Sequence, residues 1–210
     1  MIRTGILCVP TYDEAAVDAV RQLLASAVPQ AVVLQDRHAG AQRYVIEELL
    51  RHWCDEEELD LIITVGGTLP APGPSERECV AEATLAVADR LAPGLAEAMR
   101  AYAVEETPLA LLDRGVSAIR GRSLLLNLPA GAGPATLFLE AVVEVLDAYV
   151  AHLQELPSAP QLADEVTFTN TTADETDTDN ETAGTASAGH GLDADEFREF
   201  LKRRSGPATG

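Results

Sequence analysis

The feature that most constrains this chain is a short apolar run that ends in a pair of glycines and precedes a helical pattern. Residues 61–63 are Leu-Ile-Ile, residues 64–68 read TVGGT, and an alanine-rich stretch follows after a proline-containing loop. A buried parallel strand that ends in this way places backbone N–H groups at the carboxyl edge of a sheet, where α/β proteins bind ligands, often anionic ones. The segment therefore predicts an α/β fold with a ligand site beside Gly66 and Gly67.

The rest of the chain alternates between strand and helix patterns. Short apolar runs that predict strands cover residues 2–9, 31–34, 59–65 and 123–128, with weaker runs at 108–112 and 116–119. Apolar residues at helical spacing cover residues 12–27, 42–58, 79–90, 93–102 and 135–153. Thr11 is the expected N-cap of the first helix. Alternation of this kind is typical of βαβ units, so we expect an α/β fold with a mainly parallel sheet.

Composition limits the functions that the chain can have. It has 210 residues, of which 47% are apolar, so one globular domain with a substantial core is expected. Its net charge of −19 argues against nucleic acid as a partner, because phosphate backbones are bound by basic patches. No apolar run approaches the roughly 20 residues that span a membrane, and the first residues lack the pattern of a secretory signal. We therefore expect a cytoplasmic protein that contacts neither nucleic acid nor membrane.

The composition changes after residue 156. Residues 157–192 are rich in Thr, Ala, Asp and Glu and contain no lysine or arginine, so we expect a disordered acidic linker. Residues 193–204, DADEFREFLKRR, begin with acids and end with bases, as the helix dipole favours, and predict a short helix. Its apolar stripe would dock either on the domain or on a partner. The predicted organisation is a domain over residues 1–156, a linker over 157–192 and a helix over 193–204.

Five segments of the chain resemble one known family. Residues 64–68 are similar to its TTGGTG motif, 83–90 (ATLAVADR) to the helix that follows, 93–100 to MPGxxExMR, 107–119 to PTAxLSR-xxVGVI, and 126–129 (LNLP) to LNLPG. A single motif of this kind is common, but five in the same order and at similar spacing are specific. On these segments the chain resembles the MogA/MoaB family of molybdenum cofactor biosynthesis proteins.

The resemblance implies a three-layer α/β/α molybdopterin-binding fold that assembles as a homotrimer or a higher homo-oligomer. In this family the pterin and its phosphate lie at the carboxyl ends of the strands, and Mg-ATP donates an adenylyl group to the phosphate. Such chemistry needs backbone N–H groups that hold phosphates and carboxylates that hold Mg²⁺. The molybdopterin-binding residues that the resemblance implies here lie in two loops: Gly66, Gly67, Thr68, Asn127, Pro129 and Gly131.

The chain departs from the family where the chemistry is expected. Leu69 stands at the family's fourth glycine, the loop after it is longer, and Glu78 stands at the family's aspartate. Glu78 is the candidate catalytic residue and Mg²⁺ ligand, and the alternative interpretation is an exposed acid at a helix N-terminus, which the helix dipole favours. The family's acidic turn after the second strand is replaced by residues 37–41, which carry no carboxylate, so Asp36 is the candidate second metal ligand.

Three functions remain open at this point. The family's activity favours an enzyme, a molybdopterin adenylyltransferase that uses ATP and Mg²⁺. The departures at Leu69 and around Asp36 favour a non-catalytic protein that binds the pterin or acts as a scaffold for other cofactor-assembly proteins. The acidic tail favours an interaction protein that oligomerises and recruits partners.

Overall fold

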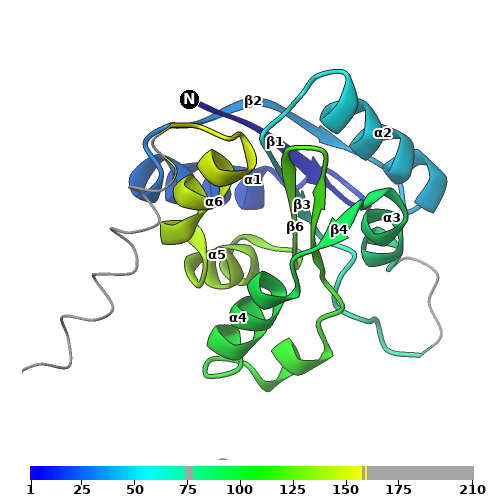
Figure 1. Ribbon diagram of the computed structural model, residues 1–210. Helices are drawn as coiled ribbons and strands as arrows, with labels where there is room; N and C mark the ends of the chain where they lie inside the picture. Colours follow the sequence, from blue (N-terminus) through cyan, green and yellow to red (C-terminus); the bar gives the residue numbers. More distant parts are fainter. Residues whose placement is uncertain (74–77, 158, 160–210) are drawn as a thin grey trace, which may run out of the picture. The chain divides into compact units, whose positions relative to one another are not determined.

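A six-stranded sheet in the order β2-β1-β3-β6-β5-β4 forms the centre of the fold (Figure 1). The computed structural model describes residues 1–73, 78–157 and 159. The strands are β1 (Ile2–Cys8), β2 (Ala31–His38), β3 (Leu61–Val65), β4 (Arg90–Leu91), β5 (Ser117–Arg120) and β6 (Ser123–Leu128). Strands β2, β1, β3 and β6 are parallel, whereas β5 pairs antiparallel with both β6 and β4. The expected α/β fold with a mainly parallel sheet is confirmed.

The parallel strands end at one edge of the sheet. Cys8 lies opposite Val65, and Val65 lies opposite Leu128, so the last residues of β1, β3 and β6 are in register. His38, the last residue of β2, lies opposite Cys8. The loops that follow these strands therefore leave the sheet at the same level, and a ligand at this edge can contact more than one of them.

Helices cover both faces of the sheet and give three layers (Figure 1). One face carries α1 (Glu14–Ala27), α4 (Pro93–Ala103), α5 (Ala132–Glu140) and α6 (Leu146–Leu153), and the other carries α2 (Arg43–Asp55) and α3 (Val80–Val87). Ile63 and Leu126 belong to the core on the first face, and Ile62 and Leu125 to the core on the second. Because both faces are covered, the central strands are apolar along their whole length.

The helix predicted over residues 135–153 is broken. Helix α5 ends at Glu140, the 3₁₀ turn η2 (Val143–Val145) follows, and α6 begins at Leu146. Val142 and Val143 are consecutive, yet both are buried in the core on the same face. In a continuous helix the second valine would point about 100° away from the first. The break lets both side chains pack, so the prediction of one long helix is wrong.

Three smaller predictions also differ from the structure. Asp13, not Thr11, caps α1, because the Asp13 carboxylate accepts a hydrogen bond from the N–H of Ala16 at 3.0 Å. The strand predicted over residues 31–34 is longer, since β2 pairs with β1 along the whole of both strands. The weak apolar run after α4 forms a 3₁₀ turn, η1 (Pro108–Leu112), rather than a strand.

The described residues all belong to one compact unit, residues 1–173. The predicted linker over 157–192 and helix over 193–204 lie outside the described residues, apart from 157 and 159. No helix in the described part of the chain is long and apolar enough to cross a membrane.

Candidate functional site

A turn of two glycines follows β3 and brings the chain against its neighbours. Gly66 has a φ of +100° and Gly67 a φ of +67°, both in the left-handed region that favours glycine. The N–H of Gly66 donates to the carbonyl oxygen of Leu128 at 2.8 Å. A Cβ atom on Gly66 would lie 2.0 Å from the carbonyl oxygen of Val9, so only glycine fits there. The turn therefore joins the ends of β1, β3 and β6.

Just beyond this turn, Gly67 is placed to offer a backbone N–H group to a ligand. In the described part of the chain, the N–H groups of Gly67 and Thr68 donate to no backbone carbonyl. Gly67 is partly exposed, whereas Thr68 is fully buried, so only the N–H of Gly67 can be reached from outside. Helix α5 begins on the neighbouring loop after Gly131, which is partly exposed and has a φ of +91°, and Pro129 in that loop is buried. The N–H of Gly67 and the helix N-terminus together favour an anion at this edge.

The buried side chain of Asn127 forms hydrogen bonds that link the segments at this edge of the sheet. Asn127 is fully buried, and its Nδ2 donates to the hydroxyl oxygens of Thr64 and Thr84, both at 2.9 Å. Its Oδ1 accepts from the N–H of Val116 at 3.1 Å. Asn127 thus links β6 with β3, α3 and the chain before β5. The predicted binding role of Asn127 stays a prediction, and its side chain performs a structural one.

A buried carboxyl group lies beside Thr68. Asp113 is 7% exposed, and its Oδ1 accepts from the N–H of Gly115 at 2.9 Å. Burial raises the pKa of the Asp113 carboxyl, and the nearby Thr68 hydroxyl and the N–H of Gly115 oppose that rise, although neither the Thr68 Oγ1 nor the Asp113 Oδ2 has a hydrogen-bond partner within the described residues. Arg100 of α4 also opposes it, from 4.0 Å. The sequence did not indicate Asp113 or Arg100 as site residues, since only the fold brings them to Thr68.

Glu78 lies at the same edge, in a network around Arg114. The Oε1 atom of Glu78 accepts from the N–H of Ala71 at 2.7 Å, which closes the loop between them. Arg114 donates to the carbonyl oxygen of Glu78 at 3.3 Å and forms an ion pair with Glu82. The backbone N–H of Arg114 donates to the carbonyl oxygen of Thr68 at 3.0 Å. The catalytic and metal-binding roles of Glu78 stay predictions.

Asp36, the second candidate metal ligand, has other partners. Its Oδ1 accepts from the Tyr12 hydroxyl at 2.6 Å, and its Oδ2 pairs with Arg21 at 2.7 Å. The hydrogen bond to Asp36 raises the pKa of Tyr12 to about 12. Arg21 belongs to α1 on one face of the sheet, whereas Glu78 shortly precedes α3 on the other. Within the described ranges, no group of three or more His, Cys, Asp or Glu residues could hold a metal ion.

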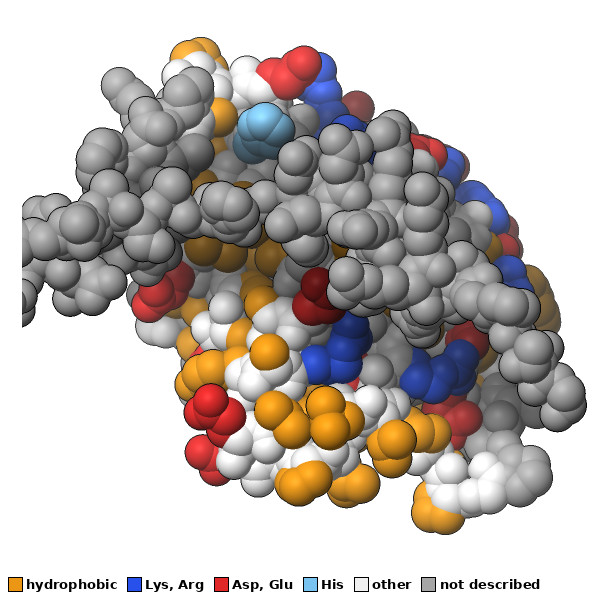
Figure 2. All heavy atoms as spheres, turned by 60° about the horizontal axis from the view of Figure 1, so that its bottom comes forward, with side chains coloured by type: hydrophobic (Ala, Val, Ile, Leu, Met, Phe, Trp, Pro, Cys, Tyr) orange, Lys and Arg blue, Asp and Glu red, His pale blue; other side chains and the backbone are white. Residues whose placement is uncertain are grey.

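The surface beside the site is apolar. Leu109, Leu111 and Leu112 of η1 are 62%, 69% and 57% exposed, and Tyr102 of α4 is 47% exposed. Figure 2 brings the side of α4 and η1 forward and shows hydrophobic side chains gathered next to basic and acidic ones. An exposed apolar patch next to a polar site is typical of an interaction surface.

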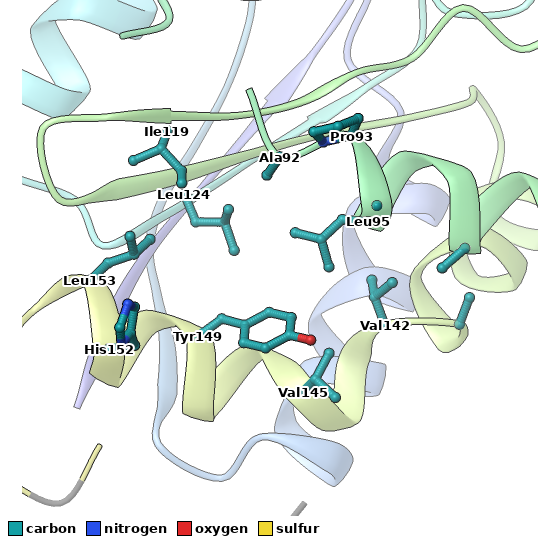
Figure 3. Close-up of a pocket in the computed structure, with 13 residues that line it drawn as sticks. Ala92, Pro93, Leu95, Ile119, Leu124, Val142, Val145, Tyr149, His152 and Leu153 are labelled. Carbon is teal, nitrogen blue, oxygen red and sulfur yellow. The ribbon is translucent and has the colours of Figure 1, made fainter. Parts of the chain in front are cut away.

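An apolar cavity lies away from the glycine turn. It has a volume of about 570 Å³ and lies between α4, α6 and the β5–β6 hairpin (Figure 3). Leu95, Ile119, Leu124, Tyr149 and His152 are among its lining residues. Leu124 is near the start of β6, whereas the glycine turn contacts the end of that strand. The cavity therefore does not belong to the candidate site.

The chain is similar to a known family over most of its length. The family model described as "Probable molybdopterin binding domain" matches residues 6–148. The "Molybdopterin adenylyltransferase" of Escherichia coli (strain K12) is 36% identical over 141 residues, which cover 67% of this chain and 70% of that protein. The protein of the same name from Haemophilus influenzae is 38% identical over 118 residues, 56% of this chain and 58% of that protein.

Solved structures share the fold. The molybdopterin biosynthesis enzyme MoaB from Thermus thermophilus has a TM-score of 0.67 and 39% identity, and the match covers 75% of this chain and 99% of that one. The molybdopterin biosynthesis Mog protein from Mycobacterium ulcerans has a TM-score of 0.61 and 26% identity, with 72% and 98% covered. These matches bear out the three-layer fold expected from the sequence.

Replacing Gly66 by alanine tests the close contact with Val9. We expect Gly66→Ala to lower the free energy of unfolding by roughly 3–5 kcal/mol, from left-handed strain and overpacking together. Gly121→Ala is the matched control, because Gly121 has a φ of +55° but open space around its Cβ position. The control should lose only about 1–2 kcal/mol. Urea denaturation measures both, and equal losses would contradict the contact.

Replacing Asn127 by alanine tests the buried network. The change leaves the N–H of Val116 without its acceptor and removes the donor to the hydroxyls of Thr64 and Thr84 in the interior, so we expect a loss of about 2–4 kcal/mol in unfolding free energy. Gln30→Ala, which removes an exposed hydrogen bond to Asp147, should change stability by no more than about 0.5 kcal/mol. If urea denaturation shows a similar small loss of unfolding free energy for both variants, the network does not stabilise the fold.

Asp113 predicts a pH dependence of stability. Because its folded-state pKa is raised, its contribution to stability is present at low pH and is lost as the pH rises through the folded pKa. Asp113→Asn keeps an acceptor for Gly115 and removes the buried charge. We expect the variant to melt at a higher temperature than the wild type at pH 7, and the difference to vanish below about pH 4. Glu105→Gln is the control, because Glu105 is exposed and its substitution should not change the melting temperature in this way. A difference in melting temperature between Asp113→Asn and the wild type that grows toward low pH would contradict the prediction.

Proposed function

We propose that this chain, which belongs to the MogA/MoaB family of molybdopterin-binding domains, binds molybdopterin at the edge formed by the glycine turn and residues 127–131. The observation that carries the proposal is the register of β1, β3 and β6, which brings both loops to one level. The left-handed turn at Gly66 and Gly67 adds N–H groups beside them. The role would be a step in molybdenum cofactor biosynthesis.

The phosphate of molybdopterin is the part that this edge suits best. The partly exposed N–H of Gly67 and the N-terminus of α5 supply partial positive charge at this edge. Gly131 is partly exposed and has no side chain, and its φ of +91° lies in the left-handed region that favours glycine, so a ligand can approach its backbone closely. We propose that Pro129 shapes this loop and that Asn127 contributes through the network that holds it.

The relatives named molybdopterin adenylyltransferase extend the proposal to catalysis. A molybdopterin phosphate oxygen would bond to the α-phosphorus of ATP, and the bond to pyrophosphate would break. Glu78 is the carboxylate proposed to act there, because Arg114 connects it to Thr68. Magnesium would neutralise the phosphates of ATP, but Asp36 and Glu78 do not converge as a ligand pair, so we derive no step through the metal.

A second candidate is pterin binding without catalysis. Both oxygens of Asp36 have partners, and Leu69 occupies the position of the family's fourth glycine. A protein of this kind would hold molybdopterin for other cofactor-assembly proteins.

We also propose that the chain forms a homotrimer or a higher homo-oligomer. The apolar patch of Leu109, Leu111, Leu112 and Tyr102 supports this, because a surface of this kind is typical of an interface. Sedimentation at micromolar concentration would measure the oligomeric state.

The function is tested with purified protein, molybdopterin and Mg-ATP. Calorimetry measures molybdopterin binding, and chromatography measures the adenylylated product and pyrophosphate. We expect binding and turnover by the wild type. Glu78→Gln keeps an acceptor for Ala71 and should reduce turnover by about 10²-fold or more, while molybdopterin affinity changes little.

Glu155→Gln is the matched control, because Glu155 forms an exposed ion pair with Arg122, which precedes β6 at the end of the strand away from the glycine turn. It should leave both quantities unchanged. Binding without turnover would support the second candidate. If molybdopterin does not bind, both candidates are wrong.

A further inference from the structure

Arg114 contacts both ends of the loop that follows the glycine turn. Its backbone N–H donates to Thr68, and its guanidinium reaches the carbonyl oxygen of Glu78 and the carboxylate of Glu82. We infer that Arg114 is a positioning residue, which neutralises Glu82 and thereby lets the glycine turn accept an anionic ligand. The inference deepens the proposed function and rests on it for the identity of the ligand.

Because the Glu82 side chain is only partly exposed, its negative charge needs a neighbouring cation more than the charge of a fully exposed acid does. Its side chain is 34% exposed, and its Oε2 atom is buried and accepts no hydrogen bond within the described residues. The other oxygen pairs with Arg114, whose side chain is 45% exposed. Removing Arg114 would leave a partly buried negative charge without its cation, which is unfavourable in itself and for any anion nearby.

Glu82 is also close to the site through a chain of contacts. It lies in the first turn of α3, where Thr84 accepts a hydrogen bond from Asn127 at the end of β6. Its partner Arg114 contacts Thr68 through the backbone. Glu82 is therefore connected to the glycine turn by two contacts, its ion pair with Arg114 and the bond from Arg114 to Thr68, and salt would weaken its effect on a bound phosphate.

The neutralised pair explains how an acidic edge can hold an anion. With Arg114 in place, Glu82 contributes little net charge, and the N–H of Gly67 and the N-terminus of α5 determine the local potential. Without Arg114, Glu82 would repel the phosphate. The effect acts through Glu82, so removing the Glu82 charge as well should restore binding.

The test compares molybdopterin affinity in four proteins: wild type, Arg114→Ala, Glu82→Gln and the double variant. We expect Arg114→Ala to weaken binding about tenfold, which corresponds to about 1.4 kcal/mol. Glu82→Gln alone should change affinity by less than about threefold, and the double variant should return to within about threefold of the wild type. Arg114→Lys, which keeps the charge, should rescue most of the loss.

Arg122→Ala is the matched control, because Arg122 forms a similar exposed pair with Glu155 at the other end of β6. It should leave affinity unchanged. If the double variant binds as weakly as Arg114→Ala, Arg114 contacts the ligand or only supports the fold, and the inference is wrong. Unchanged affinity in Arg114→Ala would overturn it too.

Titrating the same proteins with pyrophosphate separates this inference from the proposed function. Pyrophosphate probes the anion site whatever organic ligand the edge takes. One outcome is that molybdopterin fails to bind while pyrophosphate affinity falls in Arg114→Ala and returns in the double variant. In that case the proposed function is wrong and the role of Arg114 is supported. If the wild type binds neither, both are overturned.

Discussion

The contact between Gly66 and the carbonyl oxygen of Val9 is the constraint on which the rest of the site depends. A Cβ atom at Gly66 would overlap that oxygen, and the N–H of Gly66 is bonded to Leu128. The chain can therefore leave β3 only through a left-handed turn that lies between the ends of β1 and β6. That turn determines where Gly67 presents its N–H group and where Thr68 is buried.

The charge of the molecule gives this arrangement its chemical meaning. A chain with a net charge of −19 is a poor partner for anions over most of its surface. Among the residues that the structure describes, two arginines near the glycine turn are already paired: Arg100 with Asp113 and the carbonyl oxygen of Gly115, and Arg114 with Glu82. A backbone N–H group and a helix N-terminus at this edge can attract a phosphate without an exposed cationic cluster.

The sequence predicted the fold better than the site. Strand β6 was predicted with its observed limits, because its apolar run is bounded by a hairpin turn and by Pro129. The break after Glu140 was missed, since helical spacing continues through Val142 and Val143 and only packing separates them. Local patterns show which side chains are apolar, but not which of them must share one face.

In the site, backbone positions were predictable and side-chain roles were not. The left-handed turn at Gly66 and Gly67 follows from the glycine pair itself. Asn127 was predicted as a binding residue, but its burial and three hydrogen bonds depend on residues far away in the chain.

Molybdopterin binding at the glycine turn is tested most directly by titrating isotope-labelled protein with molybdopterin and following the amide chemical shifts. We expect the largest changes at Gly67 and Thr68 and in the loop before α5. If the largest changes lie around the apolar cavity of α4 and α6, molybdopterin binds elsewhere and the proposed site is wrong.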